Sequence, residues 1–167
     1  IDWVDVFTRK VYRDIILSSL EHCVQHKGLV LWSYVIMSNH MHLIVSARQN
    51  NLSDTLRDMK RFTSTAILKE IMQHKKESRR DWMLKRFEFA AKQHQRNSEH
   101  QSWTHENHAV VLESPKFIRQ KCAYIHNNPV KAGWVEHASD WRYSSASNYE
   151  NKHSLIDVEL LDEMYQA

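Results

Sequence analysis

Two histidines, His40 and His42, stand two residues apart at the start of an apolar run that extends to Val45. In a β-strand, side chains at positions i and i+2 point to the same face of the sheet. The two imidazoles would therefore lie side by side, with Met41 and Leu43 on the opposite face. Neutral imidazole is the commonest metal ligand among protein side chains, so the spacing predicts half of a metal site. Taken alone, such a pair is more often two partly buried strand histidines.

Tyr124 and Asn128 stand four residues apart on a predicted helix, and residues at i and i+4 share a helix face. They project off the apolar stripe of that helix, which consists of Ile118, Cys122 and Ile125. The side-chain oxygen of Asn128 can complete a metal site begun by the two histidines. Two imidazoles and one amide oxygen leave positions for substrate oxygens, which suits Mg²⁺ or Mn²⁺ better than structural zinc. The plainer interpretation is a packing tyrosine and a helix-capping asparagine.

Positioning these side chains requires a hairpin and a helix, and the sequence predicts both. Apolar runs rich in branched residues predict strands over residues 29–37 and 40–47, joined by a turn at Ser38-Asn39. Residues 101–106 alternate weakly, which is typical of a short strand. Apolar residues at helical spacing predict helices over residues 14–27, 52–73, 81–95, 114–127 and 157–164.

Capping residues mark several of these helix ends. Ser114 and Pro115 suit the N-cap and the first position of the helix that carries Tyr124. Pro129 should end that helix, because proline disfavours helical backbone in the residue before it. The pair Asn50-Asn51 offers an N-cap for helix 52–73.

The composition is that of one globular domain. The chain has 167 residues, of which 42% are hydrophobic and 26% charged, and this is enough for a core. No apolar run approaches the roughly 20 residues of a membrane span. Cys23 and Cys122 have neither disulfide-framework nor zinc spacing, so a reducing cytoplasm is expected. A net charge of +3 permits nucleic-acid binding.

Helix 52–73 carries cations in addition to its apolar stripe. They are Arg57, Lys60, Arg61 and Lys69. A solvated helix face explains them as well as contact with nucleic-acid phosphates does.

Three motifs follow one another in the chain: residues 37–45 read MSNHMHLIV, residues 124–130 read YIHNNPV and residues 141–145 read WRYSS. In this combination the chain resembles the single-tyrosine HUH transposases, which are insertion-sequence-type enzymes, and above all their REP-associated branch. The likeness extends over residues 5–149. It implies an α+β, ferredoxin-like fold of an antiparallel sheet with packed helices. The single HUH-nuclease domain would span residues 1–167, with its first strand truncated before residue 1 and a C-terminal extension at 150–167.

Carried over position by position, the resemblance implies that His40, His42 and Asn128 bind Mg²⁺ or Mn²⁺ and that Tyr124 is the nucleophile. The residues expected to contact DNA are Lys60, Arg57, Arg61, Trp141, Arg142, Tyr143 and Ser144. His126 points elsewhere on the helix of Tyr124, so we expect it to be structural or to face DNA.

The implied activity is metal-dependent nicking and strand transfer of single-stranded DNA, in DNA transposition and recombination or in processing of palindromic hairpin repeats. Attack of a tyrosine hydroxyl on a phosphate leaves a 5′-phosphotyrosine and a free 3′-hydroxyl, which conserves the bond energy for rejoining. One alternative is a non-catalytic, transposase-derived protein that binds structured nucleic acid, and another is a structural zinc protein. The expected setting is a monomer or homodimer on single-stranded or hairpin DNA, away from membranes, in the bacterial cytoplasm and associated with the nucleoid.

Overall fold

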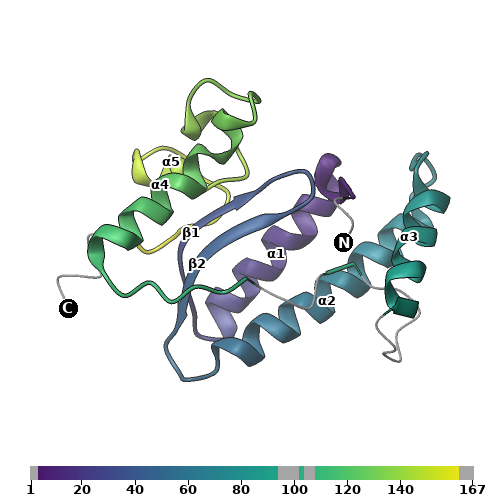
Figure 1. The fold of residues 1–167 in the computed structure, drawn as a ribbon, viewed down its shortest axis with the longest axis horizontal. Helices are drawn as coiled ribbons and strands as arrows, with labels where there is room; N and C mark the ends of the chain where they lie inside the picture. Colours follow the sequence, from purple (N-terminus) through teal and green to yellow (C-terminus); the bar gives the residue numbers. More distant parts are fainter. Residues whose placement is uncertain (1–3, 94–101, 104–107, 162–167) are drawn as a thin grey trace.

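A computed structural model describes residues 4–93, 102–103 and 108–161, and it has an α+β fold (Figure 1). Strands β1 (Leu29–Ile36) and β2 (Met41–Ala47) form an antiparallel sheet. The predicted α+β class with an antiparallel sheet and packed helices is therefore confirmed. The helical elements are η1 (Val6–Thr8), α1 (Lys10–His26), α2 (Leu52–Gln73), α3 (Arg80–Gln93), α4 (Pro115–Lys131), η2 (Ala138–Asp140) and α5 (Ala146–Tyr149).

The sheet separates two apolar clusters. On one face, α1 and α2 cover side chains that include Leu31, Tyr34 and Leu43. Helix α4 lies on the other face (Figure 1), where it covers side chains that include Val35 and Ile44. Burial of such side chains contributes roughly 1.5–3 kcal/mol each, so α4 is held against the sheet by hydrophobic packing.

Strand β1 contains one extra residue relative to β2. The register shifts between Leu31 and Ser33, which leaves Trp32 as the additional residue of a β-bulge. Because side chains alternate between the two faces of a strand, the bulge inverts the alternation in the second half of β1. There Val35 pairs with His42. The bulge thus puts an apolar residue beside this histidine on the face that α4 covers.

The second edge of β1 is bonded by residues 143–145, far along the chain. The amide of Ile36 donates to the carbonyl of Tyr143 at 2.9 Å, and the amide of Ser145 donates to the carbonyl of Tyr34 at 3.0 Å. These bonds pair the backbone groups of an otherwise open strand edge. They also fix the WRYSS segment as part of the sheet layer.

Helix α4 begins as predicted and ends later than predicted. The Ser114 side chain accepts a hydrogen bond from a backbone amide of the first turn, and a proline follows it. The prediction that Pro129 ends the helix is wrong, because Pro129 lies inside α4. The end comes at Gly133, whose φ of 71° is left-handed. Its amide donates to Val130, and the amide of Trp134 donates to Pro129, a Schellman motif that satisfies the last carbonyls.

Other predicted elements have mixed outcomes. Helix α2 has the predicted bounds, although Asn51 stands at its N-cap without a side-chain capping bond. Helix α1 starts earlier than predicted, at Lys10. The predicted helix over 157–164 is wrong for residues 157–161, which are not helical, and its other residues lie outside the described part. Residues 102–103 are not a strand, and the rest of predicted strand 101–106 lies outside the described part too. None of the helices described is long and apolar enough to cross a membrane.

Candidate active site between β2 and α4

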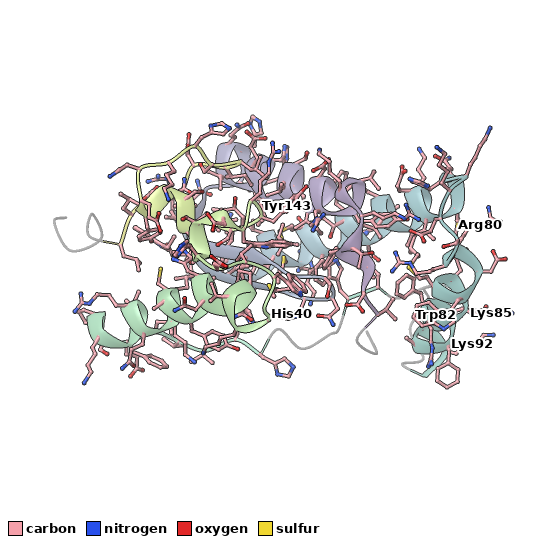
Figure 2. All side chains as sticks on the ribbon, turned by 90° about the horizontal axis from the view of Figure 1, so that it is seen from above. His40, Arg80, Trp82, Lys85, Lys92 and Tyr143 are labelled. Atoms are coloured by element: carbon pink, nitrogen blue, oxygen red, sulfur yellow. The ribbon has the colours of Figure 1, made fainter. Side chains whose placement is uncertain are left out.

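The two histidines and Tyr124 come together where α4 crosses the β2 side of the sheet. His40 directly precedes β2 and His42 lies within it, and their ring centroids are 5.0 Å apart in an edge-to-face arrangement. Figure 2 shows His40 beside α4. The ring of Tyr124 meets His42 with a centroid separation of 5.5 Å. The structure therefore joins the hairpin motif and the helix motif in one place.

Hydrogen bonding fixes the orientation of His40. Its Nδ1 lies 2.6 Å from Oδ1 of Asn39. Because an amide oxygen only accepts, Nδ1 carries the proton and Nε2 keeps its lone pair. Metal-binding histidines characteristically donate their second nitrogen to such a partner. Asn39 was expected only as a turn residue, and its position next to the histidine pair was the signal for this second role.

Both histidines are kept neutral by their surroundings. Burial lowers the pKa of His40, and a side-chain hydrogen bond with Asn128 opposes this in part. Burial also lowers the pKa of His42, and the charge that His40 carries when protonated and the charge of Lys121 lower it further. Since the ordinary histidine pKa is 6.5, both imidazoles are uncharged at neutral pH. Their lone pairs are then available to a cation.

Asn128 links the nucleophile helix to the histidine pair. Its Nδ2 donates to the backbone carbonyl of Tyr124 at 3.1 Å, one helical turn earlier. The same side chain interacts with His40 and raises its pKa. Because Nδ2 is engaged by the Tyr124 carbonyl, Oδ1 is the Asn128 atom that could bind a cation. The three predicted ligand side chains are thus neighbours.

The donor set fits an open site for a divalent cation. Two neutral imidazoles and one amide oxygen provide three positions and leave the others for water or substrate oxygens. Within the described residues there is no group of three or more His, Cys, Asp or Glu side chains able to hold a metal. The set of His40, His42 and Asn128 is of another kind, because its third member is an amide. These three residues include no fourth ligand for a closed zinc site.

Two lysines flank Tyr124 on the exposed side of α4. The Nζ atoms of Lys121 and Lys131 lie 5.9 Å and 5.2 Å from the centroid of the Tyr124 ring. The tyrosine itself is 45% exposed, so a large substrate can approach this side chain. The sequence interpretation missed both lysines, although their i−3 and i+7 spacing from Tyr124 places them on the same helix face.

His126 lies on the buried side of α4 and is structural. Its Nε2 is 2.8 Å from the hydroxyl of Ser145 and 3.1 Å from that of Ser33. Burial lowers its pKa to about 4, so it is a neutral hydrogen-bonding partner. The contacts join α4 to β1 and to the WRYSS segment, and they limit rotation of the helix that carries Tyr124.

The predicted DNA-binding residues of the WRYSS segment are mostly buried. Tyr143 is 7% exposed and Ser144 is 0% exposed. Arg13 stacks over the Tyr143 ring at 4.1 Å, and the indole of Trp141 donates to the carbonyl of Ile36. Because Tyr143 and Ser144 are buried beside β1, they present little surface for direct contact with DNA, and that contact stays a prediction. Trp141 is half-buried, whereas Arg142 is exposed.

The cations of α2 lie in another layer of the molecule. Helix α2 packs with α1 on the sheet face opposite α4, so Arg57, Lys60 and Arg61 are not part of the histidine and tyrosine cluster. Arg57 forms ion pairs with Asp54 at 2.7 Å and Asp58 at 3.6 Å. Lys60 is half-buried, and burial lowers its pKa. Any contact of these residues with DNA would be separate from the candidate site.

The fold and the site define a class of protein in which an α+β sheet presents two histidines to a tyrosine-bearing helix. The family described as IS200-like transposases matches residues 4–96, and the chain belongs to this family. The match includes His40 and His42 and ends before α4, so Tyr124 and Asn128 lie beyond it. No curated protein and no solved structure matched the chain. Membership makes the protein a DNA-processing enzyme of the transposase type, whose partner is DNA.

Proposed function

We propose that the protein cuts and rejoins single-stranded DNA through a covalent link to Tyr124, with the help of Mg²⁺ or Mn²⁺. The observation that carries the proposal is the 5.5 Å contact between the rings of Tyr124 and His42. It supports a shared site because the two residues come from separate motifs. The exposed position of Tyr124 supports attack on a polymeric substrate.

The proposed step is a transfer of one phosphoryl bond. The Oη atom of Tyr124 forms a bond to phosphorus and loses its proton to solvent, while the bond from phosphorus to the 3′ oxygen breaks. The 3′ oxygen leaves with the electron pair and takes up a proton, which yields a 5′-phosphotyrosine and a 3′-hydroxyl. Reversal of the step with another 3′-hydroxyl joins strands.

The surrounding residues have separate tasks in this proposal. Lys121 and Lys131 place positive charge beside the developing phenolate and the phosphate. His40, His42 and Asn128 would hold the divalent cation, which supplies charge stabilisation to phosphate oxygens when bound. Asn39 and His126 keep His40 and α4 in position. The histidine side of the site and the tyrosine side thus face the same phosphate.

A non-catalytic DNA-binding descendant of a transposase is the alternative. The clustering of His40, His42, Tyr124 and Asn128 favours the enzyme, because binding alone does not require a nucleophile beside neutral imidazoles. We further propose hairpin DNA from palindromic repeats as the substrate, as in the REP-associated branch. That the protein acts in a bacterial cytoplasm, as a monomer or homodimer, remains a prediction.

The test is to incubate the protein with labelled single-stranded hairpin DNA from repeats that flank the gene, with Mn²⁺ or Mg²⁺. The expected product is a protein–DNA adduct that survives denaturation. Tyr124→Phe should abolish the adduct and retain DNA binding, whereas Tyr149→Phe, a tyrosine bonded to the Trp32 carbonyl, should still form it. An adduct with Tyr124→Phe would refute the assignment, and binding without any adduct in the unmodified protein would favour the alternative.

A further inference from the structure

Helix α3 exposes two aromatic rings and two cations on one face. Trp82 is 49% exposed and Phe89 is 55% exposed, and Lys85 and Arg86 are exposed as well. These residues follow one another at spacings of three and four, so their side chains share one side of the helix. The guanidinium of Arg86 lies 6.0 Å from the centroid of the Trp82 ring.

This face is not needed to hold α3 in the fold. The opposite side of the helix packs into the protein through Met83, Phe87 and Ala91, which are almost completely buried. Large apolar rings that remain in solvent beside a satisfied core indicate a binding surface rather than incomplete packing.

The charges on the face are available to a ligand. The acidic residues of α3, Asp81 and Glu88, are neighbours of Lys85 on the helix, but each pairs with another cation: Asp81 with Arg80 at 3.2 Å and Glu88 with Lys92 at 2.6 Å. In the described part of the chain, no ion pair involves Lys85 or Arg86. The face therefore combines aromatic surface with net positive charge.

The face is separate from the candidate active site. Figure 2 shows Trp82, Lys85 and Lys92 together at one end of the molecule, whereas His40 lies beside α4. Helix α3 projects beyond α2 at the end of the molecule away from α4 (Figure 1). A ligand on this face would not compete with chemistry at Tyr124.

We propose that this α3 face is a second DNA-binding surface, on which a single-stranded part of the substrate stacks its bases. The proposal rests on the proposed action on single-stranded DNA. Trp82 and Phe89 offer ring faces to bases, and Lys85 and Arg86 neutralise the flanking phosphates. Stacking on aromatic side chains accepts any base, so the surface holds the strand while sequence is selected elsewhere.

The charge distribution favours DNA over a second copy of the chain. In a two-fold symmetric dimer the same patch lies on both subunits. Lys85 and Arg86 would then face their own copies, and like charges placed against each other oppose association. A polyanion with exposed aromatic bases complements both features of the face at once.

The experiment measures binding of a fluorescently labelled oligothymidylate by anisotropy, in a Tyr124→Phe background so that cutting does not interfere. The double variant W82A/F89A should weaken binding by about tenfold or more, as expected when two stacking rings are removed. Trp82→Phe should retain most of the affinity, because it keeps a ring. The matched control is Met72→Ala, which removes an apolar side chain of 47% exposure from α2.

A second measurement tests the charges. The double variant K85Q/R86Q should lower the slope of log affinity against log salt concentration by about 0.7 for each phosphate that the protein no longer neutralises. Lys27→Gln, an exposed lysine next to the end of α1, should leave the slope unchanged. If W82A/F89A lost its fold by circular dichroism, this salt slope would decide the question alone.

The outcomes separate this surface from the active site. If the α3 variants kept the oligothymidylate affinity and the salt slope of the parent protein, the proposed DNA-binding surface would be refuted. If, in addition, the molar mass of the protein in solution changed in these variants, the α3 face would be a self-association face instead. An adduct that persists in Tyr124→Phe would refute the proposed nucleophile while leaving the α3 result intact.

Discussion

The rings of His42 and Tyr124 meet edge to face with their centroids 5.5 Å apart, although one residue lies on β2 and the other on α4. This contact exists because α4 packs on the sheet through Ile118, Cys122 and Ile125, in one cluster with Ile44 of β2. The apolar stripe sets the rotation of the helix, and the rotation turns Tyr124 toward the histidines. Packing and the proposed chemistry therefore use different faces of the same helix.

We predict that Asn39→Ala weakens Mn²⁺ binding, measured by isothermal titration calorimetry. Asn39 accepts the Nδ1–H of His40 at 2.6 Å, and removal of such a partner typically costs about 10–100-fold in metal affinity. The control is Ser38→Ala, whose hydroxyl bonds Asp5 rather than a histidine. Equal Mn²⁺ affinity in both variants would show that the Asn39 hydrogen bond does not tune a metal site.

We predict that Lys121→Gln and Lys131→Gln each slow adduct formation by about tenfold. This decrease in rate is smaller than the one caused by removing a buried transition-state donor, because both lysines are partly solvated. The reason is their position within 5.9 Å and 5.2 Å of the Tyr124 ring. Single-turnover kinetics with labelled DNA provide the rate. Lys116→Gln, at the start of α4 and exposed, should react as the unmodified protein does, and an equal decrease there would indicate a general charge effect.

We predict that Glu77→Gln lowers the free energy of unfolding by about 3–5 kcal/mol, the usual cost of breaking a buried ion pair. The Glu77 side chain is fully buried and bonds Arg9, Arg79 and Tyr12. Urea denaturation measures the decrease. The matched control is Asp14→Asn, because the exposed pair of Asp14 with Lys10 is expected to contribute at most about 1 kcal/mol.

The Glu77 carboxyl also makes the stability of the fold depend on pH. Burial alone would raise the pKa of Glu77, but hydrogen bonds from Arg79, and then from Arg9 and Tyr12, outweigh burial and hold it at about 2, below the ordinary 4.5. A lowered carboxyl pKa stabilises the folded state above pH 4.5, and this stability is lost as pH falls from about 4.5 toward 2. Urea series at several pH values should show a smaller decline over this range in Glu77→Gln.

We predict that Gly133→Ala lowers stability by about 1–2 kcal/mol, because a side chain disfavours the left-handed backbone at φ 71°. A Cβ atom there meets nothing within 4 Å, so the cost is conformational and not steric. Thermal unfolding measures it. Gly133→Asn should be less destabilising, since asparagine tolerates this conformation, and a larger effect with asparagine would contradict the explanation.

Local patterns predicted which residues of the candidate site are neighbours. The alternation of residues 40–47 put His40 and His42 on one face, and the i, i+4 spacing put Tyr124 and Asn128 together, because both periodicities are properties of the backbone. One local pattern misled the prediction. Pro129 was expected to end α4, but the helix continues to Lys131, and the left-handed turn at Gly133 satisfies the carbonyls of Pro129 and Val130.

Tertiary contacts also decided which polar residues are accessible. The family resemblance implied that the WRYSS segment contacts DNA, yet Tyr143 and Ser144 are buried where this segment bonds to β1. Trp82 and Phe89 are large apolar residues of the kind that fill protein cores, yet the packing of α3 through Met83 and Phe87 leaves them exposed. Burial depends on what packs against a helix or strand, and a sequence window does not contain that partner.

The sequence by itself determined the chemical groups: a histidine pair, a tyrosine and an amide, each at a spacing that places it on a defined face of a strand or helix. Only the tertiary structure decided that these faces meet, since α4 packs on the sheet face that carries His42 and not on the face covered by α1. It also decided that the α2 cations lie in another layer of the molecule. The physical reason is that backbone periodicity is local, whereas the pairing of apolar surfaces is a property of the whole fold.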